Sequence, residues 1–230
     1  MNGPTFGRPV LVGVIDSGSG NAGQPGIVAV RNFGAGDDAK CRGREINEDQ
    51  QPHGSAIVRL LIEQGDDINL LIAEVFAGAQ ASSPTRVAAA IDWLVASGAA
   101  LINMSIGMRR GDAGLRLACE RADAGGVILV AATPARGAPV FPAAYRQCIA
   151  VSGDARCAET EISWLGGVNA DFGAYPFAIV GEARSGGASY AAARLSARIA
   201  GILRAGTAPA AVRQTLRAQC RYHGPERRRA

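Results

Sequence analysis

Short apolar segments alternate along the chain with longer segments whose apolar positions recur every three or four residues. A fully apolar segment such as 10–15 is typical of a parallel strand that is covered on both faces. In 85–97 the apolar positions from Val87 to Leu94 follow the helical period instead. The pattern predicts strands at 10–15, 27–33, 68–75, 100–105, 127–132, 148–152 and 177–180, and helices at 55–64, 85–97, 112–125 and from Ser189 to about Leu203.

Strands that alternate with helices predict an α/β fold of three layers, with a mainly parallel central sheet and helices on both faces. The chain has 230 residues, of which 48% are hydrophobic and 19% charged, so we expect one domain with one substantial core. In this interpretation the domain spans 10–205 and follows an N-terminal extension at 1–9. Residues 206–230 are predicted to form a C-terminal helix and a basic tail packed on the same domain.

The chemistry is concentrated where Gly186-Gly187-Ala188-Ser189 leads into an alanine-rich helical segment. A serine in the first turn of a helix lies among free backbone N–H groups and the positive end of the helix dipole. The Ser189 amide could therefore hold a tetrahedral oxyanion. A serine is a weak nucleophile without a base, and the chain has two histidines. His223 lies in an arginine-rich tail, whereas His53 opens a predicted helix.

Three motifs follow one another in a recognisable order. The strand at 10–15 ends in Asp16-Ser17-Gly18, a later helix opens with His53-Gly54-Ser55, and Ser189 comes last. In this order the motifs resemble the subtilisin-like serine proteases, peptidase family S8, whose fold has the layers predicted above. The resemblance implies a serine endopeptidase in which Asp16 orients His53, His53 is the base and Ser189 forms the acyl-enzyme.

Each of these residues also has an interpretation without catalysis. Asp16 could be a loop or cap residue, His53 an ordinary histidine at a helix start, and Ser189 a helix cap. Asn103 is interpreted as a structural side chain that satisfies nearby backbone. The catalytic interpretation is favoured because the three motifs occur together and in order.

The resemblance also implies where a peptide would bind. Residues 102–107 resemble the substrate-binding strand of the family, and Ser105, Ile106 and Gly107 would offer an open backbone edge to an extended peptide. Ala131, Ala132 and Thr133 would form a second wall of the pocket for the residue before the scissile bond. Neither wall carries a charge, so we expect a small or apolar residue there.

One part of the family pattern is missing. The segment after the strand at 127–132 usually supplies an asparagine that donates to the oxyanion, but this chain has Thr133-Pro134 there. Losing one such donor typically costs about 10²–10³ in turnover. Thr133 is the nearest substitute beside the Ser189 amide, and Arg136 is a more remote one. Asp37-Asp38 and Asp66-Asp67 are isolated acidic pairs without calcium-ligand spacing, so we expect no metal and no cofactor.

The five cysteines have no metal-binding spacing and are interpreted as free thiols of a cytoplasmic protein. The first residues show no secretory signal, and no segment is long enough to span a membrane. The net charge is +4, and arginines crowd the last forty or so residues. A solvated helical face is favoured over a nucleic-acid site, because no aromatic residues are interleaved for stacking. These arginines are Arg194, Arg198, Arg204, Arg213, Arg217, Arg221 and Arg227 to Arg229.

The compact motifs and the missing prosegment indicate one specific cut in a dedicated precursor rather than bulk digestion. In these features the chain resembles the small maturation protease of quinohemoprotein amine dehydrogenase, which removes the leader of a cross-linked small subunit. The resemblance implies leader-peptide removal from a modified subunit or peptide, with a modifying enzyme as a possible partner. The alternative is a catalytically weak or inactive peptide-binding scaffold in a maturation complex.

Overall fold

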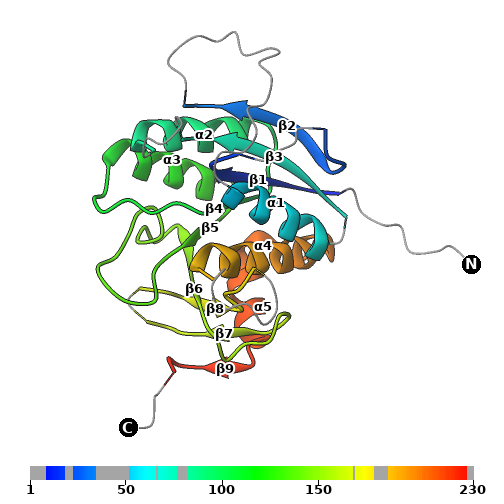
Figure 1. The fold of residues 1–230 in the computed structure, drawn as a ribbon, viewed down its shortest axis with the longest axis vertical. Coiled ribbons are helices and arrows are strands. Elements are labelled where there is room, and N and C mark those ends of the chain that lie inside the picture. Colours follow the sequence, from blue (N-terminus) through cyan, green and yellow to red (C-terminus); the bar gives the residue numbers. More distant parts are fainter. Residues whose placement is uncertain are drawn as a thin grey trace, which may run out of the picture.

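The computed structural model describes residues 9–18, 23–34, 52–65, 67–76, 82–167, 169–178 and 186–226. Its centre is a nine-stranded sheet in the order β2-β3-β1-β4-β5-β6-β8-β7-β9 (Figure 1). Neighbouring strands are parallel except at the antiparallel pair of β7 and β8. The strands are β1 Val10–Asp16, β2 Ile27–Asn32, β3 Ile68–Glu74, β4 Leu101–Met104, β5 Ile128–Ala132, β6 Cys148–Gly153, β7 Ile162–Trp164, β8 Phe172–Ala174 and β9 Tyr222–His223.

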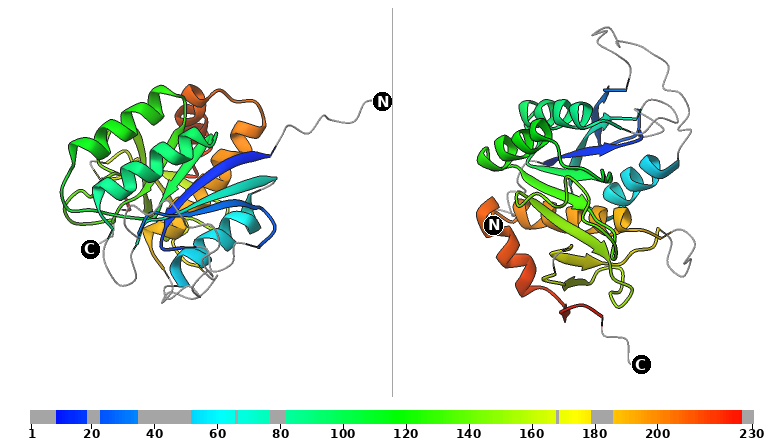
Figure 2. Two further views of the ribbon diagram at one scale, coloured as in Figure 1. Left: turned by 90° about the horizontal axis from the view of Figure 1, so that it is seen from above. Right: turned by 90° about the vertical axis from the view of Figure 1, so that its left-hand side faces the viewer.

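Helices cover both faces of the sheet, which confirms the predicted three-layer α/β fold (Figure 2). On one face α1 (Pro52–Gln64), α4 (Ala188–Arg204) and α5 (Val212–Ala218) share a core with the sheet. On the other face α2 (Pro84–Ala96) and α3 (Ala113–Ala124) share a second core. A short 3-10 helix, η2 (Pro209–Ala211), precedes α5. None of the described helices combines the length and the apolar character needed to cross a bilayer.

The starts of α2 and α3 follow from local sequence. The hydroxyl of Ser83 accepts a hydrogen bond from the Arg86 amide, and Pro84 occupies the first turn of α2. At the start of α3 the Asp112 carboxylate accepts from the Leu115 amide. Such caps satisfy amides that the helix itself leaves without partners, and proline has no amide to satisfy. Both predicted helices are therefore confirmed.

Three short strands were not predicted, and one predicted strand is wrong in its described part. Strands β7, β8 and β9 have two or three residues each, too few to show an alternating pattern. In the predicted strand at 177–180, Phe177 forms one isolated antiparallel bridge with Gly186, and residue 178 is in a bend. Residues 179 and 180 lie outside the described residues, as do 1–8, Asp37, Asp38, Cys41, Asp66 and Arg227 to Arg229.

The interpretation of the C-terminal arginines as a solvated face is wrong for Arg194, whereas the later described arginines are partly or fully exposed. Arg194 is 4% exposed and therefore buried. The other arginines are more exposed, but each one still has a protein partner. The partners are Glu159 and the Phe177 carbonyl for Arg194, Gln219 and the Thr160 carbonyl for Arg198, Asp67 for Arg204, Asp171 for Arg213, the Trp164 ring for Arg217 and Glu161 for Arg221.

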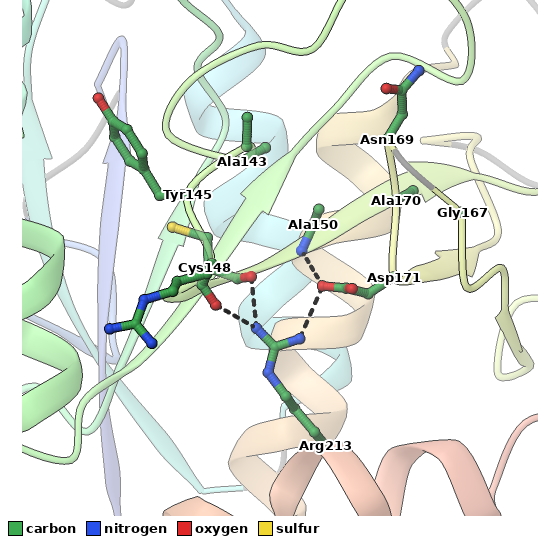
Figure 3. Close-up of a pocket in the computed structure, with 11 residues that line it drawn as sticks. Ala143, Tyr145, Cys148, Ala150, Gly167, Asn169, Ala170, Asp171 and Arg213 are labelled. Carbon is green, nitrogen blue, oxygen red and sulfur yellow. Dashed lines mark hydrogen bonds and ion pairs between the residues drawn. The ribbon is translucent and has the colours of Figure 1, made fainter. Parts of the chain in front are cut away.

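A pocket of about 300 Å³ lies at the amino ends of β6 and β8 (Figure 3). Across it, Arg213 donates to the Asp171 carboxylate at 2.9 Å and to the Cys148 carbonyl at 2.6 Å. The same carboxylate accepts from the Ala150 amide at 3.0 Å. The carboxyl ends of the parallel strands, where α/β folds bind ligands, are at the other end of the sheet. We interpret the pocket as the place where Arg213 attaches α5 to the sheet, rather than as a ligand site.

A buried carboxylate organises the turn between β6 and β7. Asp154 is 6% exposed and accepts hydrogen bonds from the Arg156 side chain at 2.7 Å and from the Ser163 hydroxyl at 2.6 Å. Burial alone would raise the pKa of Asp154, but the hydrogen bonds from Arg156 and Ser163 outweigh it and lower the pKa below its usual value. A carboxylate with a lowered folded-state pKa stabilises the fold above its unfolded-state pKa of about 3.9.

We expect Asp154→Asn to lower the free energy of unfolding by about 2–3 kcal/mol at pH 7, because a charged acceptor of several hydrogen bonds is lost. The difference between wild type and variant should shrink as the pH falls below about 4, because the unfolded chain then binds a proton at this carboxylate, and the loss is complete only below the lowered pKa of the folded protein. Urea unfolding at pH 7 and pH 3 measures it. Asp123→Asn, an exposed site on α3, is the control and should change little at either pH. A penalty that stays constant with pH would contradict the account.

Candidate active site

Asp16 and His53 meet at the carboxyl end of the sheet. Asp16 is the last residue of β1, and His53 is the second residue of α1. Nδ1 of His53 lies 3.0 Å from Oδ1 of Asp16, 37 residues away along the chain. If Nδ1 carries the proton, it donates to the carboxylate and Nε2 is the basic nitrogen. The sequence predicted this pair, and the structure brings its two members together.

The surroundings of the pair differ for its two members. Asp16 is 1% exposed, and its Oδ1 also accepts from the Ser17 amide at 2.6 Å and from the Ser17 hydroxyl at 3.2 Å. Its Oδ2 is buried and has no hydrogen-bond partner among the described residues. The His53 side chain is 38% exposed. A buried carboxylate thus holds one side of an imidazole whose other side is accessible to a reactant.

Close backbone packing fixes the start of α1. A Cβ atom at Gly54 would lie 2.1 Å from the Gly18 carbonyl oxygen and 2.8 Å from the Gly18 nitrogen. No real Cβ makes such contacts, so the loop after Asp16 and the first turn of α1 can approach this closely only because residue 54 is glycine. The glycine that follows His53 therefore has a steric role in bringing the imidazole to Asp16.

Ser189 lies in the first turn of α4, and the next residue, Tyr190, has a ring contact with His53. Helix α4 begins at Ala188 after Gly187, and no side chain caps it, so Ser189 is not the cap residue. The Tyr190 ring centroid is 5.9 Å from the centroid of the His53 ring. Helices α1 and α4 pack on the same face of the sheet. The contact between Tyr190 and His53 places the turn that carries Ser189 beside the imidazole.

The segment after β4 has the features expected of a peptide-binding edge. The Ser105 amide donates to the Ile15 carbonyl at 3.3 Å, which ties the segment to the strand that ends in Asp16. In the described part of the chain no backbone hydrogen bond involves the amides of Ile106 and Gly107. Gly107 is exposed, whereas Ile106 is buried. The next residue, Met108, pairs with Phe141, so the open edge is limited to 105–107.

Asn103 links this edge to α4. Its side chain donates to the Ser105 hydroxyl at 3.2 Å and accepts from the Ser196 hydroxyl at 3.1 Å. It is fully buried and satisfies side chains rather than the backbone we expected. The edge at 105–107 is thereby connected to the helix that carries Ser189.

Ala131 and Ala132 end the neighbouring strand β5 and Thr133 follows it, beside the edge at 105–107. All three are buried, with Thr133 2% exposed. The Thr133 amide donates to the Val151 carbonyl at 2.9 Å, so this amide is committed to the sheet. Any donation to an oxyanion from this residue would have to come from its hydroxyl. Pro134 follows and has no amide hydrogen.

The described cysteines, Cys119, Cys148, Cys157 and Cys220, are all free thiols. Burial raises the pKa of Cys157 to about 11. A hydrogen bond with Cys119 and burial raise the pKa of Cys148 well above its usual value. Thiols with raised pKa values stay protonated at neutral pH and are poor nucleophiles. Ser189 is therefore the better nucleophile candidate.

Comparison with solved structures decides the fold. A lanthipeptide protease aligns with 93% of this chain and 80% of its own, with a TM-score of 0.71 and 16% identity. A mutant of the protease domain of PatA aligns with 96% of this chain and 94% of its own, with a TM-score of 0.67 and 20% identity. The chain has the subtilisin-like fold.

A larger enzyme with this fold matches in part. The psychrophilic subtilisin-like protease Apa1 from the Antarctic psychrotroph Pseudoalteromonas sp. AS-11 aligns with 65% of this chain, with a TM-score of 0.51 and 22% identity. The aligned part is 37% of Apa1, so this chain spans little more than a third of that structure. No protein-family model and no curated protein sequence matches the chain. The subtilisin-like fold is thus visible in the structure at low sequence identity.

The sequence did not predict the contacts of two side chains near the site, Tyr190 and Arg194. The ring contact of Tyr190 with His53 depends on how α1 and α4 pack. Arg194 was predicted to lie on a solvated basic face, yet it is buried and donates to the Phe177 carbonyl. No local pattern predicts either contact, because both depend on residues distant in the chain.

Proposed function

We propose that this chain is a serine endopeptidase in which Ser189 is the nucleophile, His53 the general base and Asp16 the residue that orients it. The observation that carries the proposal is the 3.0 Å contact between His53 and the buried Asp16, beside the turn that holds Ser189. Asp16, His53 and Ser189 come from β1, α1 and α4, so the proposed triad depends on the packing of three elements rather than on one local motif.

The proposed reaction has two halves. Nε2 of His53 accepts the hydroxyl proton as Ser189 Oγ bonds to the peptide carbonyl carbon. His53 then returns the proton to the leaving amine as the carbon–nitrogen bond breaks, and the acyl group stays on Ser189. In the second half a water molecule gives a proton to His53 and attacks the acyl carbon. The bond between that carbon and Ser189 Oγ then breaks, His53 returns the proton to Oγ, and the new carboxyl end is released. The negative charge on Asp16 stabilises the imidazolium in both halves.

The Ser189 amide at the start of α4 is the proposed first oxyanion donor, and the Thr133 hydroxyl the second. An extended peptide would pair with residues 105–107, whose amides at Ile106 and Gly107 have no backbone partner among the described residues. Both walls, 105–107 and 131–133, are uncharged, which favours a small or apolar residue before the scissile bond. No metal or cofactor takes part in this proposal.

The proposed substrate is a single precursor that loses its leader peptide during maturation, in the reducing cytoplasm where free thiols persist. One solved neighbour is a lanthipeptide protease that covers most of this chain, which favours a peptide as the substrate. The precursor could also be a modified small subunit, as in quinohemoprotein amine dehydrogenase maturation, with the modifying enzyme as a partner.

Covalent labelling tests the proposal directly. We expect a fluorophosphonate to add once to the wild type, as measured by intact mass, and not to Ser189→Ala or His53→Ala. The reason is that such reagents bond to a serine only when a base activates it. Ser55→Ala, at the start of α1, is the matched serine control and should still be labelled.

The alternative is a binding scaffold that keeps the edge at 105–107 without turnover. The Thr133-Pro134 sequence, which removes the usual donor, is the observation that favours it. A folded wild type that gains no adduct, alone or with its precursor, would establish the scaffold and rule out the protease.

A further inference from the structure

Arg194 is a buried cation with three directed contacts. It lies on α4 five residues after Ser189, and its side chain is 3% exposed. The guanidinium donates to the Glu159 carboxylate at 3.0 Å and to the Phe177 carbonyl at 2.9 Å. Its central carbon is 5.1 Å from the centroid of the Tyr175 ring. Two of the three contacts therefore hold the segment 175–177.

That segment in turn holds the start of the serine helix. Phe177 bridges Gly186 in an antiparallel pair, and the Gly187 amide donates to the Pro176 carbonyl at 2.8 Å. Gly187 is the residue directly before α4. The contacts therefore form a closed circuit. Arg194, in the second turn of α4, holds segment 175–177, and this segment holds Gly186 and Gly187, which lead into the first turn of α4.

Glu159 extends the circuit to the histidine helix. The oxygen that accepts from Arg194 also accepts from the Gln64 side chain at 3.1 Å. Gln64 is the last residue of α1, the helix that begins near His53. One carboxylate therefore joins the helix of the base and the helix of the nucleophile.

The burial of this charge needs a reason other than stability. A buried ion pair stabilises a fold no better than apolar side chains of similar size, because desolvation offsets the attraction. An apolar residue at 194 cannot bind a carboxylate, a carbonyl and a ring face at once, whereas the planar guanidinium can. What the arginine adds is geometry.

We propose that Arg194 is a positioning residue that keeps Ser189 aligned with His53 through segment 175–177. This inference rests on the proposed function of Ser189. Reaction rates depend steeply on such geometry, since a misplacement of about 1 Å can cost about 100-fold. Arg194 touches neither substrate nor reacting atoms, so its effect must pass through the Gly186–Gly187 backbone.

The test compares Arg194→Met with Arg198→Met. Arg198 lies one turn further along α4 and binds Gln219 and the Thr160 carbonyl instead of segment 175–177. We expect Arg194→Met to lower the rate of fluorophosphonate labelling by about 10- to 100-fold and Arg198→Met to change it less than 3-fold.

Two further readouts separate positioning from loss of stability. Amide hydrogen exchange at Gly187 should become at least 10-fold faster in Arg194→Met and remain unchanged in Arg198→Met. In Arg194→Ala, about 20 mM guanidinium ion should restore labelling in a saturable way, since it can occupy the vacated site, whereas it should not accelerate Arg198→Ala.

The outcomes distinguish the two proposals. If folded Arg194→Met is labelled at the wild-type rate, or if its Gly187 amide exchanges as in the wild type, the positioning role is wrong. If the wild type itself is not labelled, the protease proposal fails. The hydrogen-exchange comparison would still decide whether Arg194 fixes the start of α4.

Discussion

Replacing Asp16 by asparagine should lower the labelling rate and the peptidase turnover about 10⁴-fold, the loss found for this change in other serine proteases. Asp16 is 1% exposed and its Oδ1 faces Nδ1 of His53, so the substitution removes a buried charge directly beside the imidazole. The amide cannot stabilise the imidazolium as the carboxylate does, and it can donate to Nδ1, which selects the wrong tautomer. Stopped-flow or quenched labelling measures the rate.

The fold should survive this change, because asparagine matches aspartate in size and shape. Thermal unfolding of Asp16→Asn beside the wild type checks this. The matched control is Asp112→Asn, where the carboxylate caps α3 on the other face of the sheet. It should be labelled at the wild-type rate. A loss of less than 10-fold in Asp16→Asn would show that Asp16 does not orient the base.

Gly54→Ala should lower the labelling rate at least 100-fold and the free energy of unfolding by about 1–3 kcal/mol. The new methyl group would meet the Gly18 carbonyl oxygen at 2.1 Å. A backbone atom cannot rotate away as a side chain can, so the first turn of α1 must move. His53 is the preceding residue and would move with it.

Gly201→Ala is the control for Gly54→Ala. Gly201 also lies in a helix, α4, and no atom lies within 4 Å of a Cβ built there. Alanine should stabilise that helix by up to about 1 kcal/mol and leave labelling unchanged. If Gly54→Ala reacts like the wild type, the close approach between Gly18 and α1 does not position His53.

Elements with a complete local pattern could be predicted from the sequence, and elements defined by distant partners could not. Strand β1 is an uninterrupted apolar segment, and α2 has a cap, a proline and a helical period. Strand β8 has three residues and exists because β6 and β7 lie on its two sides. The apolar residues after Phe177 resemble a strand locally, but Phe177 pairs with Gly186 at a single bridge.

The candidate site follows the same division. The order of Asp16, His53 and Ser189 predicted a site, and the contact between Asp16 and His53 agrees with that prediction. The roles of the three residues, and that of Thr133, remain proposals. Tyr190 and Arg194 could not be assigned because an aromatic or basic residue on a helix has many possible neighbours. Only the packing of α1 on α4, and of α4 on segment 175–177, selects one.

Two of the contacts that attach α5 to the sheet do not depend on pH near neutrality. Arg213 binds the Cys148 carbonyl and Arg217 lies over the Trp164 ring, and neither acceptor can gain or lose a proton near neutral pH. Guanidinium groups keep their charge up to about pH 12. The strength of these two contacts therefore does not change as the pH rises through the range in which a histidine base loses its proton. Raising the pH should thus deprotonate the proposed catalytic base without weakening the attachment of α5 to the sheet.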